Sequence, residues 1–189
     1  YNEYMTKITD DSQLIETTTA SRRIYDGRIL NLREDTVSLA DKTESYREVV
    51  EHKPAVVILP VESNDGIYLI RQYRQPLAKV IYEAPAGMIE VDEDPAVAAA
   101  RELEEETGFI ARSWHQLGGT FMAPGFCDEY IHYFVAKDLS AGDVSFDDDE
   151  RISLHKFSLS QLTKMIETAE IEDAKTALII LWAMQRNLI

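Results

Sequence analysis

Three glutamates close together in the chain, Glu102, Glu105 and Glu106, have a spacing that could support chemistry. In a helix, positions i, i+3 and i+4 lie on one face, so their carboxylates would crowd together. Like charges repel, and negative charge near the carboxyl end of a helix also opposes the helix dipole. Carboxylate oxygens are the ligands that Mg²⁺ and Mn²⁺ prefer, and a divalent cation would offset this repulsion. On the glutamates alone, a solvated acidic helix face on which Arg101 and Glu105 form a surface pair is the favoured interpretation, and a metal site is the alternative.

The flanking residues predict the helix that this spacing requires. Asp94 followed by Pro95 is a strong helix start, because aspartate caps free amides and proline suits the first helical position. Residues 96–100 are four alanines and one valine, which sustain a helix and give it a face for packing on a sheet. Gly108 is placed to end it.

The whole segment Gly87–Phe109 resembles the Nudix box. It consists of glycine, five residues, glutamate, seven residues, and then Arg-Glu-apolar-x-Glu-Glu-x-Gly-apolar, so every defined position is met. The resemblance implies an enzyme that hydrolyses a pyrophosphate bond with Mg²⁺ or Mn²⁺ as cofactor. Such a cation would activate water and neutralise the charge that develops on phosphate oxygens.

The same resemblance implies roles for individual residues. Glu105 and Glu106 match metal ligands, and Glu102 matches a further ligand or catalytic partner. The backbone carbonyl of Ala86 would complete the metal site. The structural positions of the motif are two glycines and an ion pair that holds the loop against the helix: Gly87, Gly108, Glu93 and Arg101.

Segments outside the box resemble the ADP-ribose pyrophosphatase branch of that family, over roughly Tyr25 to Phe157. They are residues 46–52, 70–76, 83–87 and 123–129. In the last of these, Pro124 lies sixteen residues after Gly108, where a proline is typical of ADP-ribose hydrolases and a tyrosine of diadenosine polyphosphate hydrolases.

This branch implies a substrate pocket. Arg47 and Arg74 match arginines that contact substrate, Glu129 matches a pocket glutamate, and Met88 is a candidate to pack against the base. Arginine suits phosphate through its two-pronged hydrogen bonding, although a surface salt bridge is the alternative for each arginine. The expected partner is a nucleoside diphosphate sugar, ADP-ribose first and GDP-mannose or another sugar nucleotide second. Two other readings are a non-catalytic ligand-sensing module on the same fold and a hydrolase of oxidised nucleoside triphosphates.

A general base is expected outside the box, because many members of this branch carry one on an acidic loop between the last two strands. The matching stretch here is residues 146–151. Glu150 is our first choice for the base and Asp148 the second, with Glu102 as the candidate if neither serves.

The formal net charge of −15 at pH 7 limits the classes of partner. So acidic a surface repels phosphate backbones, which argues against nucleic-acid binding and requires local cations or metal for an anionic substrate. No apolar run reaches the roughly 18 residues that a membrane span needs. The single cysteine, Cys127, fits a reducing cytoplasm. We therefore expect a cytoplasmic protein with neither nucleic acid nor membrane as partner.

Hydrophobic patterning predicts the elements around the box. Residues 55–61 are a near-continuous apolar run, typical of a strand buried on both faces. Residues 138–149 are polar and predict a loop. The remaining predictions are strands at 16–21, 36–40, 46–52, 67–72, 130–136 and 152–157, and helices at 161–169, capped by Ser160, and 174–186.

Together these elements predict an α+β fold, a Nudix-type α/β/α sandwich with a mixed sheet, preceded by a small N-terminal antiparallel β extension. We place the extension at residues 1–50 and the hydrolase domain at residues 51–189. The resemblance further implies a homodimer in which the strands of the extension cross over and help to build the partner's site.

Overall fold

The computed structural model describes residues 10–62, 66–142 and 151–189 of the chain. The chain folds into two compact units. The first contains the N-terminal residues up to Lys53 together with Ala123–Glu129, and the second contains Pro54–Met122 and Tyr130–Ile189. In the described part of the chain, no helix combines the length and the apolar character that crossing a membrane would demand.

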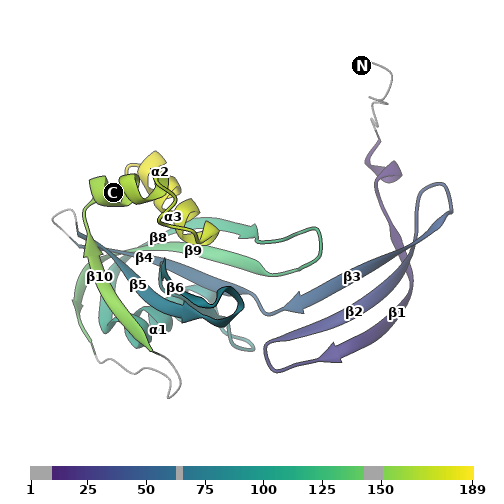
Figure 1. The fold of residues 1–189 in the computed structure, drawn as a ribbon, viewed down its shortest axis with the longest axis horizontal. Helices are drawn as coiled ribbons and strands as arrows, with labels where there is room; N and C mark the ends of the chain where they lie inside the picture. Colours follow the sequence, from purple (N-terminus) through teal and green to yellow (C-terminus); the bar gives the residue numbers. More distant parts are fainter. Residues whose placement is uncertain (1–9, 63–65, 143–150) are drawn as a thin grey trace. The chain divides into compact units, whose positions relative to one another are not determined.

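The first unit is built on a three-stranded antiparallel sheet in the order β1-β2-β3 (Figure 1). Its strands mix charged residues with threonine and valine and bury few side chains, as suits a sheet with solvated faces. The segment 123–129 joins this unit where Asp128 accepts a hydrogen bond of 2.8 Å from the amide of His52. The elements are η1 (Asp11–Gln13), β1 (Thr17–Asp26), β2 (Leu30–Ser38) and β3 (Glu44–His52).

The second unit contains a seven-stranded mixed sheet. Its main path runs β10-β5-β4-β9-β8, while β6 pairs with β5 and β7 pairs with β4. Strands β4 and β9 run parallel, and the other pairs between described strands are antiparallel. The strands are β4 (Ala55–Glu62), β5 (Gly66–Arg74), β6 (Lys79–Glu83), β7 (Ala86–Met88), β8 (Phe109–Phe121), β9 (Tyr130–Ala141) and β10 (Ile152–Phe157).

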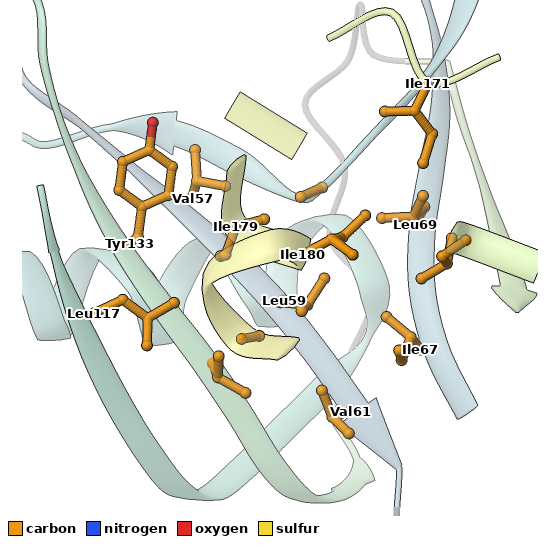
Figure 2. Packing of buried hydrophobic residues seen from close by; sticks show 14 of the residues in the cluster. Val57, Leu59, Val61, Ile67, Leu69, Leu117, Tyr133, Ile171, Ile179 and Ile180 are labelled. Carbon is orange, nitrogen blue, oxygen red and sulfur yellow. The ribbon is translucent and has the colours of Figure 1, made fainter. Parts of the chain in front are cut away.

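Helices cover both faces of this sheet (Figure 1). Because successive strand residues point to opposite faces, β4 serves two cores. Val56 and Ile58 pack with the buried residues of α1, whereas Val57 and Leu59 pack with α3. Figure 2 shows this second core, with α3 lying over β4. The helices are α1 (Pro95–Thr107), α2 (Leu159–Glu167) and α3 (Ala174–Gln185), with the 3₁₀ turn η2 (Gln75–Leu77) after β5.

The α/β/α sandwich with a mixed sheet and the preceding antiparallel extension are therefore confirmed. The main differences from the prediction are three strands that were not expected, β6, β7 and β8, and two misplaced bounds. Strand β9 continues to Ala141, so residues 138–141 are strand rather than loop. Helix α2 begins at Leu159 and is capped by Ser158, not Ser160, because the Ser158 hydroxyl and the Gln161 side chain each bond the other residue's amide.

Candidate metal and active site

Helix α1 places two of the predicted metal-binding glutamates, Glu102 and Glu106, beside the short strand β7. Asp94 caps the helix by accepting a hydrogen bond of 2.8 Å from the Ala96 amide, and Gly108 ends it in the left-handed region at φ 69°. Ala98, Ala99 and Leu103 are fully buried against the sheet. Elsewhere on the helix, Glu102 and Glu106 contact the backbone of β7, and Glu105 accepts a hydrogen bond from Arg101.

Strand β7 approaches the glutamates so closely that one position has no room for a side chain. A Cβ built on Gly87 would lie 1.9 Å from Cδ of Glu102 and 2.0 Å from its Oε1. The neighbouring amide of Ala86 donates a hydrogen bond of 3.0 Å to Oε2 of Glu106. The carboxylates of Glu102 and Glu106 therefore both lie against the backbone of residues 86–87.

Arg101 links the helix to the loop that follows β7. Its Nε and Nη2 each donate a hydrogen bond of 3.0 Å to the carboxylate of Glu93, and Nη2 also donates to the carbonyl of Met88 at 3.2 Å. Its Nη1 donates to Glu102 at 2.7 Å and to Glu105 at 3.0 Å. These bonds raise the pKa of Arg101, with the Glu93 bond as the main cause, and the guanidinium in turn lowers the pKa of Glu93. The expected ion pair with Glu93 is present, and so is the i,i+4 pair with Glu105.

The donor chemistry around α1 fits a hard divalent cation, because the available ligands are carboxylate and carbonyl oxygens. Within the described ranges, however, no group of three or more Asp, Glu, His or Cys side chains converges closely enough to hold an ion. Nη1 of Arg101 instead bonds both Glu102 and Glu105. A cation held by these two carboxylates would have to compete with that guanidinium.

Arg74, expected to bind substrate, lies at the end of β5 and is held by a buried glutamate. Its Nε donates to Oε1 of Glu83 at 2.6 Å and its Nη2 to Oε2 at 2.9 Å. The side chain of Glu83 is 1% exposed, whereas that of Arg74 is 38% exposed. Burial raises the pKa of Glu83, but the bonds from Arg74 and Lys175 outweigh it and leave that pKa below its ordinary value. The hydrogen bonds to Glu83 raise the pKa of Arg74.

No sequence pattern assigns Glu83 a role. Its only signal was its place at the start of the segment 83–87, directly before the residues that contact α1. A charged residue at the end of an apolar strand is predicted to be exposed, because charged side chains are rarely buried. The fold shows that Glu83 is buried.

The other predicted site residues lie in separate parts of the chain. Met88, on β7, is partly exposed. Arg47 and Glu129 belong to the first unit: Arg47 pairs with Glu16 there, and Glu129 lies 3.3 Å from Nδ1 of His52. The candidate bases lie outside the described residues: Asp148 and Glu150.

Comparison with known families matches both parts of the chain. The NUDIX domain matches residues 51–177, and the nucleoside diphosphate sugar hydrolase N-terminal domain matches residues 16–50. The first match covers most of the chain and includes the whole helix and loop described above. The chain therefore belongs to the Nudix family, whose members typically depend on a divalent metal.

Individual relatives cover nearly the whole chain. An ADP-ribose pyrophosphatase of Bacillus subtilis (strain 168) is 38% identical over 166 residues, which is 87% of this chain and 90% of that protein. A methanol dehydrogenase activator of Bacillus methanolicus is 39% identical over 167 residues, again 87% of this chain and 90% of that protein. A crystal structure of an ADP compounds hydrolase superposes with a TM-score of 0.82 at 22% identity, covering 90% and 92% of the two chains, and supports the fold.

Proposed function

We propose that this chain hydrolyses the pyrophosphate bond of ADP-ribose to give AMP and ribose 5-phosphate, with Mg²⁺ or Mn²⁺ as cofactor. The observation that carries the proposal is the packing of Glu102 and Glu106 against the backbone of residues 86–87 within a matched NUDIX domain. The 38% identity to an ADP-ribose pyrophosphatase over 87% of the chain supports the choice of substrate.

The proposed metal ligands are Glu102, Glu105 and Glu106 of α1 and the carbonyl of Ala86. When bound, a divalent cation would neutralise charge on the diphosphate and make water a stronger nucleophile. Arg101 keeps its paired bonds to Glu93 in this proposal and gives up those to Glu102 and Glu105. Gly87 and Gly108 remain structural, the first by admitting the Glu102 carboxylate and the second by ending the helix.

The chain's own side chains would bind and orient the diphosphate. Arg74 is rigidly held by Glu83 through two bonds and is still more than one third exposed, which suits an anion-binding group. By resemblance, Arg47, Glu129 and Met88 are further residues proposed to contact the substrate. The general base is proposed to be Glu150, with Asp148 second, and it takes the proton of the attacking water.

We also propose a homodimer formed through the extension, residues 1–50. The sheet of the first unit exposes several large apolar side chains, as expected for a surface that a second copy covers. They are Ile24, Tyr25, Ile29, Leu30 and Tyr46. Sedimentation equilibrium at micromolar concentration should give the mass of two chains; a fully active monomer would contradict the proposal.

The substrate test is a panel of compounds with Mg²⁺ and product identification by chromatography. ADP-ribose should be cleaved to AMP and ribose 5-phosphate faster than GDP-mannose, diadenosine tetraphosphate or an oxidised nucleoside triphosphate. Glu106→Gln serves as the matched control for contaminating hydrolases. Faster turnover of GDP-mannose would replace the proposed substrate with the second candidate, and binding without hydrolysis would indicate a ligand-sensing module.

The match to a methanol dehydrogenase activator motivates a second candidate function, action on another enzyme. A methanol dehydrogenase assay with and without the chain tests it directly. Stimulation by wild type but not by Glu106→Gln would connect that activity to the same site.

A further inference from the structure

Arg74 belongs to a cluster of four charged side chains that joins two distant parts of the second unit. Glu83 accepts two bonds from Arg74 on one side and a bond from Nζ of Lys175 on the other. The same Nζ lies 2.9 Å from Oδ1 of Asp173. Lys175 is in the first turn of α3 and Asp173 is its N-cap, so the start of this helix reaches the hairpin formed by β5 and β6.

The cluster is well shielded from water except at Arg74. The exposed fractions of the side chains are 1% for Glu83, 13% for Asp173 and 15% for Lys175, against 38% for Arg74. Charges in such surroundings interact more strongly than on the surface, because less water screens them. Within the described residues, Glu83 accepts the side-chain bonds that the guanidinium of Arg74 donates, and it engages Nε and Nη2. Neither of these two bonds uses Nη1.

The start of α3 is also tied to the backbone that leads into β7. The hydroxyl of Thr176 accepts a hydrogen bond of 2.7 Å from the amide of Ala84 and donates one to Asp173. Thr176 is fully buried. Lys175 is therefore fixed relative to both Glu83 and the segment that reaches residues 86–87.

The net charge of the cluster determines how strongly the guanidinium of Arg74 can attract an anion. Two cations and two carboxylates make it neutral overall at pH 7. Without Lys175 the same cluster would carry a net negative charge, and Arg74 alone would compensate a buried Glu83. An exposed guanidinium whose charge is cancelled by its carboxylate partner attracts a diphosphate poorly, especially in a chain whose formal net charge is −15.

We propose that Lys175, held by Asp173, is a positioning residue for Arg74: it shares the charge of Glu83, so that Arg74 stays fixed in place while its positive charge faces the diphosphate of the substrate. This proposal rests on the proposed function, because it assigns Arg74 to substrate binding. It extends the site to the start of α3, more than 90 positions along the chain from Glu83.

The test compares Lys175→Met with Lys175→Arg and with Lys79→Met. Lys79 is the matched control: it pairs with Glu172, joining the same two segments through an ion pair in which both side chains are nearly half exposed. With ADP-ribose and saturating Mg²⁺, Lys175→Met should raise KM about tenfold and change kcat less than about threefold. Lys175→Arg should restore KM, and Lys79→Met should match wild type.

A double variant shows whether Lys175 acts through Glu83. In a Glu83→Gln background the buried negative charge is gone, so Lys175→Met should no longer raise KM. Thermal unfolding of every variant separates loss of fold from loss of binding. A KM for Lys175→Met equal to that of Lys79→Met, or the same rise in KM in both backgrounds, would overturn the proposal.

A binding measurement keeps this proposal distinguishable from the proposed function. Calorimetry with inorganic pyrophosphate in EDTA requires no turnover. The dissociation constant should rise about tenfold in both Lys175→Met and Arg74→Gln relative to wild type and Lys79→Met. If wild type hydrolyses none of the compounds but the two variants still bind pyrophosphate more weakly, only the proposed function fails. Equal dissociation constants in all four proteins would overturn the role of Lys175.

Discussion

Replacing Gly87 with alanine tests whether the packing of β7 on α1 is what positions Glu102. The added Cβ would lie 1.9 Å from Cδ of Glu102, whereas ordinary contact begins at 3.4 Å. The carboxylate would have to retreat by the difference, about 1.5 Å. The backbone itself accepts alanine, because Gly87 is not among the described glycines with positive φ.

The effect should fall on turnover rather than on folding. The Glu102 carboxylate is at the end of a flexible side chain and can move away, but it then loses its hydrogen bond from Arg101. That loss lowers the unfolding free energy by roughly 0.5–1.5 kcal/mol. A loss of that size lowers the unfolding midpoint by no more than about 6 °C in a chain of this length. A displacement of about 1 Å in an active site lowers the rate about 100-fold, so kcat should fall by at least that factor.

The assay is kcat for ADP-ribose at saturating Mg²⁺, with Mn²⁺ affinity from electron paramagnetic resonance and thermal unfolding by circular dichroism. The control is Gly87→Ala in a Glu102→Ala background, where the colliding carboxylate is absent. If the glycine acts only through Glu102, the alanine should have no further effect there. A single variant with wild-type Mn²⁺ affinity and kcat within about threefold of wild type would refute the reasoning.

The metal ligands, the proposed general base and the buried glutamate each give a further prediction. Chelation of divalent metal should abolish turnover reversibly. Glu105→Gln and Glu106→Gln should each remain folded and lower kcat at least about 100-fold. Near-normal turnover in both variants would contradict their assignment as metal ligands. A variant combining Glu150→Gln with Asp148→Asn should lower kcat with little change in KM, and retention of about half the turnover would point to another base. Because the pKa of Glu83 lies below its ordinary 4.5, its contribution to stability is complete above that pH and is lost as pH falls through the lower folded value. Urea unfolding at a series of pH values should therefore show a shallower acid loss for Glu83→Gln; equal slopes would contradict it.

The parts of the site that the sequence predicts are those governed by local rules. Helix α1 has its cap, its start and its stop within residues 94–108, and each signal acts over a few positions, so the helix was predicted with its cap and stop in the right places. The apolar run of β4 likewise predicts burial on both faces, which the two cores confirm.

What the sequence leaves out depends on distant partners. Strand β8 was not predicted, because its buried positions do not alternate and a register shift interrupts it between Gln116 and Gly118. The bond from Lys175 to Glu83 spans 92 positions and joins an element near the end of the chain to a strand before the box. Neither residue is unusual in its own neighbourhood, so no periodicity or cap could indicate that the two meet.

The contacts of Arg101 have a consequence for how the protein matures. One guanidinium bonds three carboxylates, of Glu93, Glu102 and Glu105, and so relieves much of the repulsion that would otherwise oppose helix α1. The scaffold can thus reach its native form before any ion arrives, unlike small zinc modules, in which ion binding supplies the folding free energy. If the chain binds a divalent cation as proposed, loading exchanges the guanidinium at Glu102 and Glu105 for that cation. A cell short of divalent ions would then hold the protein folded but inactive.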